Sequence, residues 1–338
     1  MPAAPGRDRD RRCRPQTRRG RSTRSSRSSP RTPTMFLSTC PSTRPRSGMT
    51  DAHGHLGTSA RDVIGLSPEE RIARMQSRRF TEYPRCRMVL DLLSDQVNQP
   101  SGVVKPNLLV WGESGQGKST IMKKHLRDHP AVFDKQTGVR RAAVVGLEMP
   151  PMCDVKWFYI KLLSAIDAPV SESRSSLPVL ADRVVALYRL MGVRQILVDE
   201  AHNMLMGSVR QQRMMLAVIR NLSNELGIPL VLFGIQDARE ALMHDRQLTR
   251  RFRFIELPMW GAGAEFQALV GSILRSLPLR RPSPLTARAL KTLLTHSDGG
   301  TAKLFETFID LGIDAIRSGE ERITPEMIKD YVSLPVLA

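Results

Sequence analysis

Short continuous apolar runs alternate with longer amphipathic segments in the middle of the chain. Runs typical of strands that are buried on both faces of a parallel sheet occupy 108–111, 141–147, 195–198, 229–233 and 255–257. Between them, apolar residues recur at helical spacing over 155–166, 178–191 and 209–226. This alternation predicts βαβ units and a doubly wound α/β fold with three layers, in which helices cover both faces of a parallel sheet.

Helical patterns flank this region on both sides. Ser67-Pro68-Glu69-Glu70 supplies a helix N-cap, a proline at the first helical position and acidic residues in the first turn. A second amphipathic helix is predicted over 84–97. After Trp260 the strand patterns stop, and helices are predicted over 264–277, 286–296, 301–317 and 325–332. We therefore expect a small helical lid after the sheet.

These patterns divide the 338 residues into four parts. We expect a disordered leader over 1–48, an N-terminal helical segment over 49–102, the α/β domain over 103–262 and the helical lid over 263–338. The leader is mostly Arg, Ser, Pro and Thr, so it cannot bury enough apolar surface to offset the entropy of ordering. It fits a DNA-binding arm, and it equally fits an upstream extension of a chain whose translation starts at Met35 or Met49.

The net charge of +18 lies mainly in that leader. Residues 1–48 hold 13 Arg and no Lys against two Asp, a net charge of +11, which leaves +7 for the rest of the chain. The folded part is therefore only mildly basic. The four cysteines form no CxxC pair and no cluster with histidines, which argues against a zinc site or a disulfide framework and fits a reducing cytoplasm. No stretch approaches the ~20 apolar residues of a membrane span, so we expect no membrane partner.

A complete phosphate-binding loop follows the first apolar run. Gly112-Glu113-Ser114-Gly115-Gln116-Gly117-Lys118-Ser119 matches G-x-x-x-x-G-K-[ST], and Thr120 continues into a predicted helix. In this pattern the glycines let successive backbone N–H groups point at phosphate oxygens, and the helix N-terminus adds positive potential. We expect Lys118 to reach the β- and γ-phosphates and Ser119 to bind Mg²⁺.

Two acidic residues end a later apolar run, Ile196-Leu197-Val198. Carboxylates at the carboxyl end of a central parallel strand lie beside the phosphate loop in sheets of this kind. Asp199 is therefore predicted to hold the Mg²⁺ shell, and Glu200 is predicted to polarise the attacking water.

Other polar residues have two interpretations. Arg250-Arg251 precedes the last apolar run, where an arginine would reach the γ-phosphate of a neighbouring subunit, although a solvated cluster or a DNA-facing patch is also consistent. Lys303 in the lid is expected to contact the nucleotide or to be an exposed lysine. His202 is more typical of a polar switch or a packing residue than of a metal ligand, because no second ligand stands at metal spacing. Four methionines are predicted to fill the core, namely Met204, Met206, Met214 and Met215.

Further segments complete a set that resembles a known family. They include Arg79-Phe80-Thr81-Glu82-Tyr83-Pro84-Arg85, Lys105-Pro106-Asn107-Leu108-Leu109, Glu148-Met149-Pro150-Pro151, Asp199-Glu200-Ala201-His202-Asn203, Leu222-Ser223-Asn224-Glu225-Leu226, Asp245-Arg246-Gln247-Leu248-Thr249-Arg250-Arg251-Phe252 and Leu257-Pro258-Met259-Trp260. The chain resembles the TniB family, the AAA+ ATPases of bacterial DNA transposition that are related to TnsC. The resemblance covers about residues 66–325, and the run from 199 to 260 makes it specific.

The resemblance implies an AAA+ fold, ATP and Mg²⁺ as cofactors, a homo-oligomeric ring or filament on duplex DNA, and recruitment or activation of a DDE transposase. It also implies that Arg251, rather than Arg250, is the finger supplied to a neighbouring subunit. One position departs from the family. A threonine that senses the γ-phosphate is common after the fourth strand, but this chain has Gly234-Ile235-Gln236. Either Gln236 substitutes for it, or phosphate sensing and hydrolysis are weak.

Three basic residues are candidates for contact with DNA. Arg140, Arg141 and Lys156 lie in or near the loops after the phosphate-binding helix. A ring or filament needs only a few basic groups in each subunit, because phosphate contacts add across subunits and carry no sequence information. We expect DNA binding to be largely independent of sequence and to fall steeply with salt.

Two other functions remain open at this point. A loader or initiator of a replicative helicase would also be a DNA-associated AAA+ protein, although no helix-turn-helix pattern follows the lid. A nucleotide-bound scaffold with negligible hydrolysis would act by protein contacts alone, and it predicts no loss of function on Glu200→Gln.

Overall fold

Five parallel strands form the central sheet, in the spatial order β4-β5-β6-β1-β7. The computed structural model describes residues 53–77, 80–100, 105–170 and 175–331. The predicted leader lies outside these described residues. The strands of the sheet are β1 (Asn107–Trp111), β4 (Val144–Glu148), β5 (Gln195–Asp199), β6 (Leu230–Gly234) and β7 (Phe252–Glu256). The predicted parallel sheet is confirmed.

The register brings the ends of these strands to common edges. β1 lies between β6 and β7, and its last residue, Trp111, pairs with Gly234 on one side and with Glu256 on the other. Because the strands are parallel, the segments that follow β1, β5 and β6 meet at one edge, which we call the carboxyl edge. The strands begin at the opposite edge, which we call the amino edge.

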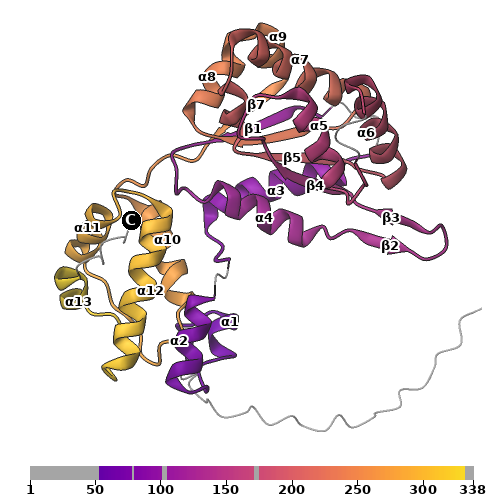
Figure 1. Ribbon diagram of the computed structural model, residues 1–338. Coiled ribbons are helices and arrows are strands. Elements are labelled where there is room, and N and C mark those ends of the chain that lie inside the picture. The colour runs from indigo at the N-terminus through magenta and orange to yellow at the C-terminus, as the bar shows by residue number, and fades with distance from the viewer. Residues whose placement is uncertain (1–52, 78–79, 101–104, 171–174, 332–338) are drawn as a thin grey trace, which may run out of the picture. The chain divides into compact units, whose positions relative to one another are not determined.

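Helices cover both faces of the sheet (Figure 1). One face carries α3 (Pro84–Asn98) and α4 (Lys118–Asp128), and the other carries α5 (Val155–Ser164), α6 (Leu177–Met191), α7 (Val209–Leu226) and α8 (Gln236–His244). Alternate residues of a strand point to opposite faces. Accordingly, Leu108 and Val110 belong to the buried cluster of the first face, and Leu109 belongs to that of the second. The three-layer architecture is confirmed.

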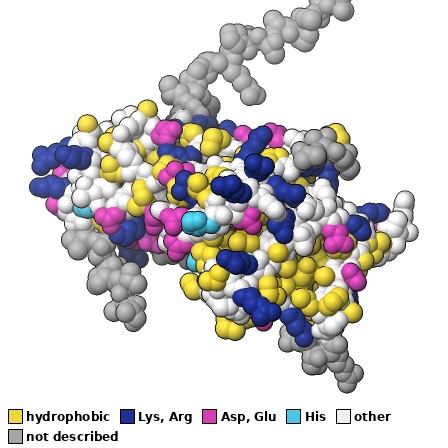
Figure 2. Space-filling model, turned by 90° about the horizontal axis from the view of Figure 1, so that it is seen from above, with side chains coloured by type: hydrophobic (Ala, Val, Ile, Leu, Met, Phe, Trp, Pro, Cys, Tyr) yellow, Lys and Arg dark blue, Asp and Glu magenta, His cyan; other side chains and the backbone are white. Residues whose placement is uncertain are grey.

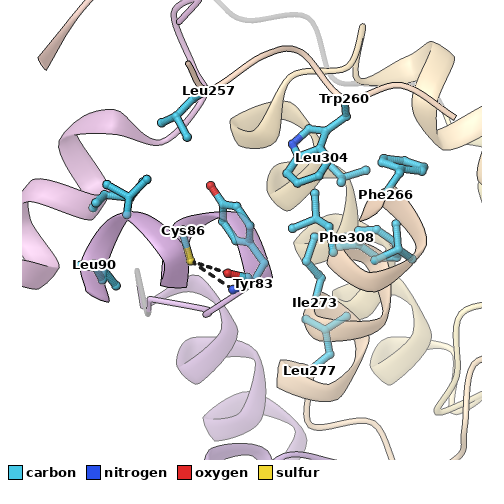
Figure 3. Close-up of a cluster of buried hydrophobic side chains, with 14 of the residues drawn as sticks. Tyr83, Cys86, Leu90, Leu257, Trp260, Phe266, Ile273, Leu277, Leu304 and Phe308 are labelled. Carbon is cyan, nitrogen blue, oxygen red and sulfur yellow. Dashed lines mark hydrogen bonds between the residues drawn. The ribbon is translucent and has the colours of Figure 1, made fainter. Parts of the chain in front are cut away.

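The segment after the sheet is helical, as predicted. It comprises α10 (Ala264–Ser276), α11 (Ala287–His296), α12 (Thr301–Arg317) and α13 (Pro325–Asp330). Apolar side chains of these helices, including Phe266, Leu304 and Phe308, form a buried cluster with Tyr83 and Trp260 (Figure 3). The lid therefore packs on the two aromatic residues that precede α3 and follow β7.

Some of the helices before the sheet contact the lid, and one contacts both the lid and α4. α1 (Thr58–Arg61) packs on α10, and α2 (Pro68–Gln76) packs on α12, whereas α3 contacts both α4 and α10. α2 begins at the predicted cap: the Ser67 hydroxyl accepts from the Glu70 N–H at 3.3 Å, and the Glu70 carboxylate accepts from the Ser67 N–H at 3.0 Å. The first two helices thus pack with the lid, and α3 links the lid to the sheet.

The single strand predicted over 141–147 is wrong. The structure has β3 (Val139–Arg141), which pairs antiparallel with β2 (Val132–Asp134), and β4 starts separately at Val144. The Asp134 carboxylate accepts from the Thr137 hydroxyl at 2.7 Å, and Gly138 adopts φ +68°, which closes a tight turn. The apolar pattern continues through Ala142 and Ala143, so it could not show where one strand ends and the next begins.

Two of the four methionines predicted to be buried are not. Met204 and Met215 are fully buried, but Met206 is 57% exposed and Met214 is 45% exposed. Met206 follows the short 3-10 helix η1 (Ala201–Leu205), and Met214 lies on α7 one position before the buried Met215, so that it points about 100° away around the helix. Among the described residues, no helix is both long and apolar enough to cross a membrane.

Candidate nucleotide-binding site

The phosphate loop joins β1 to α4 at the carboxyl edge. A Cβ atom on Gly112 would lie 2.3 Å from the Leu257 carbonyl oxygen, so only glycine fits there. Gly115 and Gly117 have φ of +79° and +85°, and Gly117 is the N-cap of α4. Left-handed backbone at these positions is readily adopted by glycine and turns backbone N–H groups toward one concave side. The loop has the form of a phosphate cradle at a helix N-terminus.

Lys118 lies in the cradle with its ammonium on the loop itself. The Nζ donates to the carbonyl oxygens of Gly112 and Glu113, both at 2.8 Å. Burial lowers the pKa of Lys118, while the carboxylates of Glu200, Asp199 and Glu113 act in the opposite direction. The charges of these carboxylates therefore reach Lys118, and the two motifs that are separate in the sequence share one site.

Asp199 and Glu200 lie where β5 ends. The Asp199 carboxylate accepts from the Glu200 N–H at 2.9 Å, and the Asp199 carbonyl accepts from the Met149 N–H at 2.9 Å. Glu200 adopts φ +51° and ψ +40°, a left-handed conformation that is uncommon for a residue with a side chain. Such backbone strain clusters at functional sites, because the surrounding structure has to maintain it.

His202 lies beside Glu200. Its Nδ1 is buried and lies 3.3 Å from the Glu200 Oε2, but it has no hydrogen-bond partner among the residues that the structure describes. The role of His202 as a polar switch or a packing residue stays a prediction. Across the described ranges, no three His, Cys, Asp or Glu side chains form a group that could hold a metal.

The residues present fit a nucleotide with Mg²⁺. Mg²⁺ keeps several water or phosphate ligands and takes one or two oxygens from the protein. Ser119 and Thr120 lie in the first turn of α4, and Asp199 ends the strand two positions across the sheet. Ser119 and Asp199 could supply these two oxygens, and the cradle of residues 112–118 would hold the phosphates.

The expected sensor position lies next to the loop. β6 ends at Gly234, whose carbonyl accepts from the Gly112 N–H at 3.2 Å, and Ile235 follows as the N-cap of α8. Gln236 is exposed, and its amide donates to Glu240 at 2.8 Å, one turn further along α8. Ile235 has no polar side-chain atom to offer a phosphate, and Gln236 would have to leave Glu240 to replace it.

Lys303 lies on the lid helix that contacts the loop. The Ala302 N–H donates to the Gly115 carbonyl at 2.9 Å, but the Lys303 ammonium is exposed and pairs with Asp298 at 2.6 Å. A contact between Lys303 and the nucleotide stays a prediction, and it requires this exposed ion pair to open.

Arg251 lies at the amino edge, far from the loop of its own chain. Its carbonyl accepts from the N–H of Asn107, the first residue of β1, at 2.9 Å. Five strand residues separate this edge from the phosphate loop, a distance of about 16 Å. The Arg251 guanidinium is exposed and donates to the side chain of Asn224 on α7. Arg251 therefore lies outside the site that its own chain builds, and so does Arg250, the exposed C-cap of α9 (Arg246–Thr249).

The three candidate DNA-contacting residues lie on two elements. Arg140 and Arg141 are exposed on β3, where Arg140 pairs with Asp167, and Lys156 is half-buried in the first turn of α5. On the face shown in Figure 2, Lys and Arg side chains are interspersed with acidic and apolar ones.

Sequence reasoning missed residues that come to the loop from distant parts of the chain. The Tyr83 hydroxyl lies 3.7 Å from the position that a Cβ on Gly117 would take. Thr301 and Gly299 of the lid contact Gln116. Nothing in the local pattern of these residues signals a contact with the loop.

Known structures share this architecture. The ORC2 protein of Aeropyrum pernix, solved as ADPNP–ADP complexes, gives a TM-score of 0.53 at 13% identity over 78% of this chain and 72% of that chain. Cdc6p of Pyrobaculum aerophilum gives 0.52 at 14% identity over 75% and 68%. At these identities the similarity shows the fold, which is that of AAA+ P-loop ATPases.

Comparison of sequences identifies a family, which is more specific than a shared fold. No curated protein matches the chain. A family model described as "Bacterial TniB protein" matches residues 71–262, which is more than half of the chain. That span runs from α2 through the phosphate loop and the acidic end of β5 to the segment after β7. The chain therefore belongs to the TniB family of AAA+ ATPases.

Proposed function

We propose that this protein is an ATP-gated regulator of DNA transposition that assembles on duplex DNA and recruits or activates a DDE transposase. The observation that carries the proposal is the separation of two half-sites. The phosphate loop, Asp199 and Glu200 meet at the carboxyl edge, whereas Arg251 lies exposed at the amino edge about 16 Å away. An arginine in that position acts on a nucleotide only if a second subunit presents it.

In this proposal ATP binds between two subunits of a ring or filament. Lys118 and the loop hold the phosphates, Ser119 and Asp199 hold Mg²⁺, and Glu200 positions the attacking water. The neighbouring subunit supplies Arg251, so occupancy of the site strengthens the subunit contact. Gly112 to Thr120 bind mainly through their backbone, and Gln236 and Lys303 approach the γ-phosphate only after their present partners release them.

The assembled subunits would bind the DNA backbone through Arg140, Arg141 and Lys156. The Arg140–Asp167 pair is exposed, and exposed ion pairs contribute little free energy, so a phosphate can replace the carboxylate at low cost. Repetition of a few contacts in every subunit then gives binding that is independent of sequence. This role places the protein in the bacterial cytoplasm, where the target DNA lies.

One observation favours a second candidate function. Ile235 occupies the expected sensor position, and it cannot form a hydrogen bond with a phosphate. A nucleotide-bound scaffold with negligible hydrolysis would tolerate this residue, because its bound state matters and turnover does not. Slow hydrolysis that DNA or the transposase stimulates is the form of the first proposal that is compatible with Ile235.

Electron microscopy of the protein with duplex DNA and a non-hydrolysable ATP analogue tests assembly. We expect rings or filaments that are absent without nucleotide and absent for Lys118→Ala, with Lys123→Ala on the exposed side of the same helix as the matched control. Assembly by Lys118→Ala equal to that of the unaltered protein would contradict ATP gating. Co-elution of the assembled protein with a DDE transposase from the neighbouring gene tests the partner, and retention of a replicative helicase instead would favour the loader.

A further inference from the structure

Gln116 is the one residue of the phosphate loop whose side chain is buried against the lid. Its exposed fraction is 2%, although it occupies a variable position of the loop motif and carries a polar amide. A buried amide costs free energy unless its donors and acceptor find partners. The partners of Gln116 therefore show what this position does.

All side-chain partners of Gln116 lie in the segment that enters the lid or at the start of α12. The Nε2 donates to the Met259 sulfur at 2.7 Å and to the Gly299 carbonyl at 3.2 Å. The Oε1 accepts from the Thr301 hydroxyl at 2.8 Å. The amide is thus held on both sides, and its orientation is set by the lid and not by the loop.

The hydrogen bonds continue from Thr301 to Trp260. The Trp260 Nε1 donates to the Thr301 hydroxyl oxygen at 2.8 Å, and both side chains are buried. Trp260 packs edge-on against Tyr83 with ring centroids 5.6 Å apart, and the Arg85 guanidinium lies 4.2 Å from the centroid of the Trp260 ring. Figure 3 shows Trp260 and Tyr83 beside Leu304 and Phe308 of the lid helix. A shift of Thr301 therefore changes the surroundings of this indole.

The backbone of the loop forms a second connection to the same turn of the lid. The Gly115 carbonyl accepts from the Ala302 N–H at 2.9 Å, so two consecutive loop residues are bonded to two consecutive residues of α12. Gly299 is also confined, since a Cβ there would lie 2.7 Å from the Trp260 carbonyl oxygen. The start of α12 cannot shift relative to Trp260 without breaking these contacts.

We propose that Gln116 is a positioning residue that latches the lid to the phosphate loop through Thr301, so that Trp260 and the lid respond to occupancy of the loop. The proposal rests on the nucleotide-binding part of the proposed function, and it is independent of DNA, transposase and subunit contacts. Phosphates order the backbone of residues 115 and 116, and the latch carries that ordering to α12. A glutamine suits the position because its amide can accept from Thr301 and donate to Gly299 at the same time.

The experiment uses Trp260 as the only indole of the full chain, in a background of Trp111→Phe and Trp157→Phe. ATP is titrated without DNA, at a protein concentration where sedimentation shows a monomer, and both the Trp260 emission and the ATP affinity are recorded. We expect ATP to change the emission, and Thr301→Val to remove most of that change while Thr301→Ser retains it. Loss of the latch is expected to weaken ATP binding about threefold to tenfold, the range of one hydrogen bond.

A double-mutant cycle separates a latch from two independent contacts. If Gln116 and Thr301 act together, Gln116→Ala combined with Thr301→Val weakens ATP binding no more than either change alone. Effects that multiply in the double variant, or a full emission response in Thr301→Val, would overturn the proposal. Thr301→Val keeps the volume of threonine without its hydroxyl, and Thr301→Ser keeps the hydroxyl without the methyl group. Thermal melts test whether both are folded, so the comparison stands even if Gln116→Ala unfolds. Failure to assemble on DNA would contradict the proposed function, but it would not affect the ATP titration, which is done without DNA.

Discussion

The two edges of the central sheet hold their candidate residues in different ways. At the carboxyl edge, Lys118 bonds to two loop carbonyls, and Asp199 accepts from the Glu200 N–H, so each group has a defined partner within the site. At the amino edge, Arg251 is exposed, and among the residues that the structure describes its guanidinium donates to one neutral side chain, that of Asn224. One chain therefore builds a site for a nucleotide, and it presents a cation that this site cannot use.

The difference shows how far each edge is organised within one chain. The carboxyl edge is organised within the single chain, since burial and backbone bonds position its groups. The amino edge has an exposed cation whose neutral contact is readily exchanged, because an exposed side chain loses little when one partner replaces another. Four substitutions test whether the two edges differ in this way.

Arg251→Ala should cause the largest loss of ATPase activity among these substitutions. An arginine supplied to the transition state accelerates hydrolysis about 10³–10⁵-fold, so DNA-stimulated ATPase activity should fall to the basal rate while monomers still bind ATP. Arg250→Ala, next to it and also exposed, is the matched control. Activity should return when Arg251→Ala is mixed with Glu200→Gln, because some interfaces then combine an intact Glu200 with an intact Arg251. A mixture that stays inactive would refute the role in trans.

Glu200→Gln should reduce hydrolysis about 10²–10⁴-fold, the usual contribution of a general base. ATP binding and assembly should persist, because glutamine keeps the size of the side chain and Lys118 is untouched. Glu256→Gln, which changes an exposed carboxylate at the end of the outermost strand β7, is the control. Steady-state phosphate release measures hydrolysis, and a filter-binding assay measures ATP binding. If transposition in cells survives Glu200→Gln, the scaffold is favoured over the hydrolytic switch.

Ile235→Thr should raise the ATPase rate by about twofold to tenfold. The change adds a hydroxyl at the expected sensor position, and one hydrogen bond is worth about 0.5–1.5 kcal/mol. Ile235→Val, which shortens the side chain without adding a polar group, controls for packing. An unchanged rate in Ile235→Thr would indicate that Gln236 already senses the phosphate, and Gln236→Ala should then lower the rate.

Arg140→Gln should have the smallest effect of the four. It should change the salt dependence of DNA affinity. Loss of one phosphate contact per bound subunit should reduce the slope of log affinity against log salt by about 0.9 for each subunit. Arg183→Gln, on α6, serves as a control for general charge. Fluorescence anisotropy at several salt concentrations provides the slope. The same slope for both proteins would remove Arg140 from the DNA interface.

Local patterns in the sequence are sufficient to predict much of the fold. The helices predicted over 209–226 and 301–317 have those bounds in the structure, because helical spacing and capping act within a few residues. The loop motif is local in the same way, and its strand and helix lie on either side as expected. The sequence gives no sign of the break between β3 and β4, because Ala142 and Ala143 join Arg141 to the apolar run at Val144 without a turn residue. The start of β7 at Phe252 was missed because alternating polar residues there hid the strand.

The contacts of particular side chains could not be predicted in this way. Gln116 has no feature in the sequence that distinguishes it from any variable residue of the loop, yet its amide bonds to lid residues 183 and 185 positions away. Met214 and Met215 are neighbours of the same type, and only the orientation of α7 buries one of them. Such pairings depend on how elements pack, and a periodic pattern describes one element at a time.

Residues close together in the chain are sufficient to predict most of the strands and helices, the phosphate loop and the acidic strand end. The packing of the elements sets what the local patterns leave open: β1 lies between β6 and β7, the charges of Asp199 and Glu200 act on Lys118, and Arg251 lies at the amino edge. It also decides that Gln116 binds the lid. The physical reason is that parallel pairing sets the positions of strand ends by register across the sheet, and hydrogen bonds to a buried amide are formed by whichever groups the packing brings within reach.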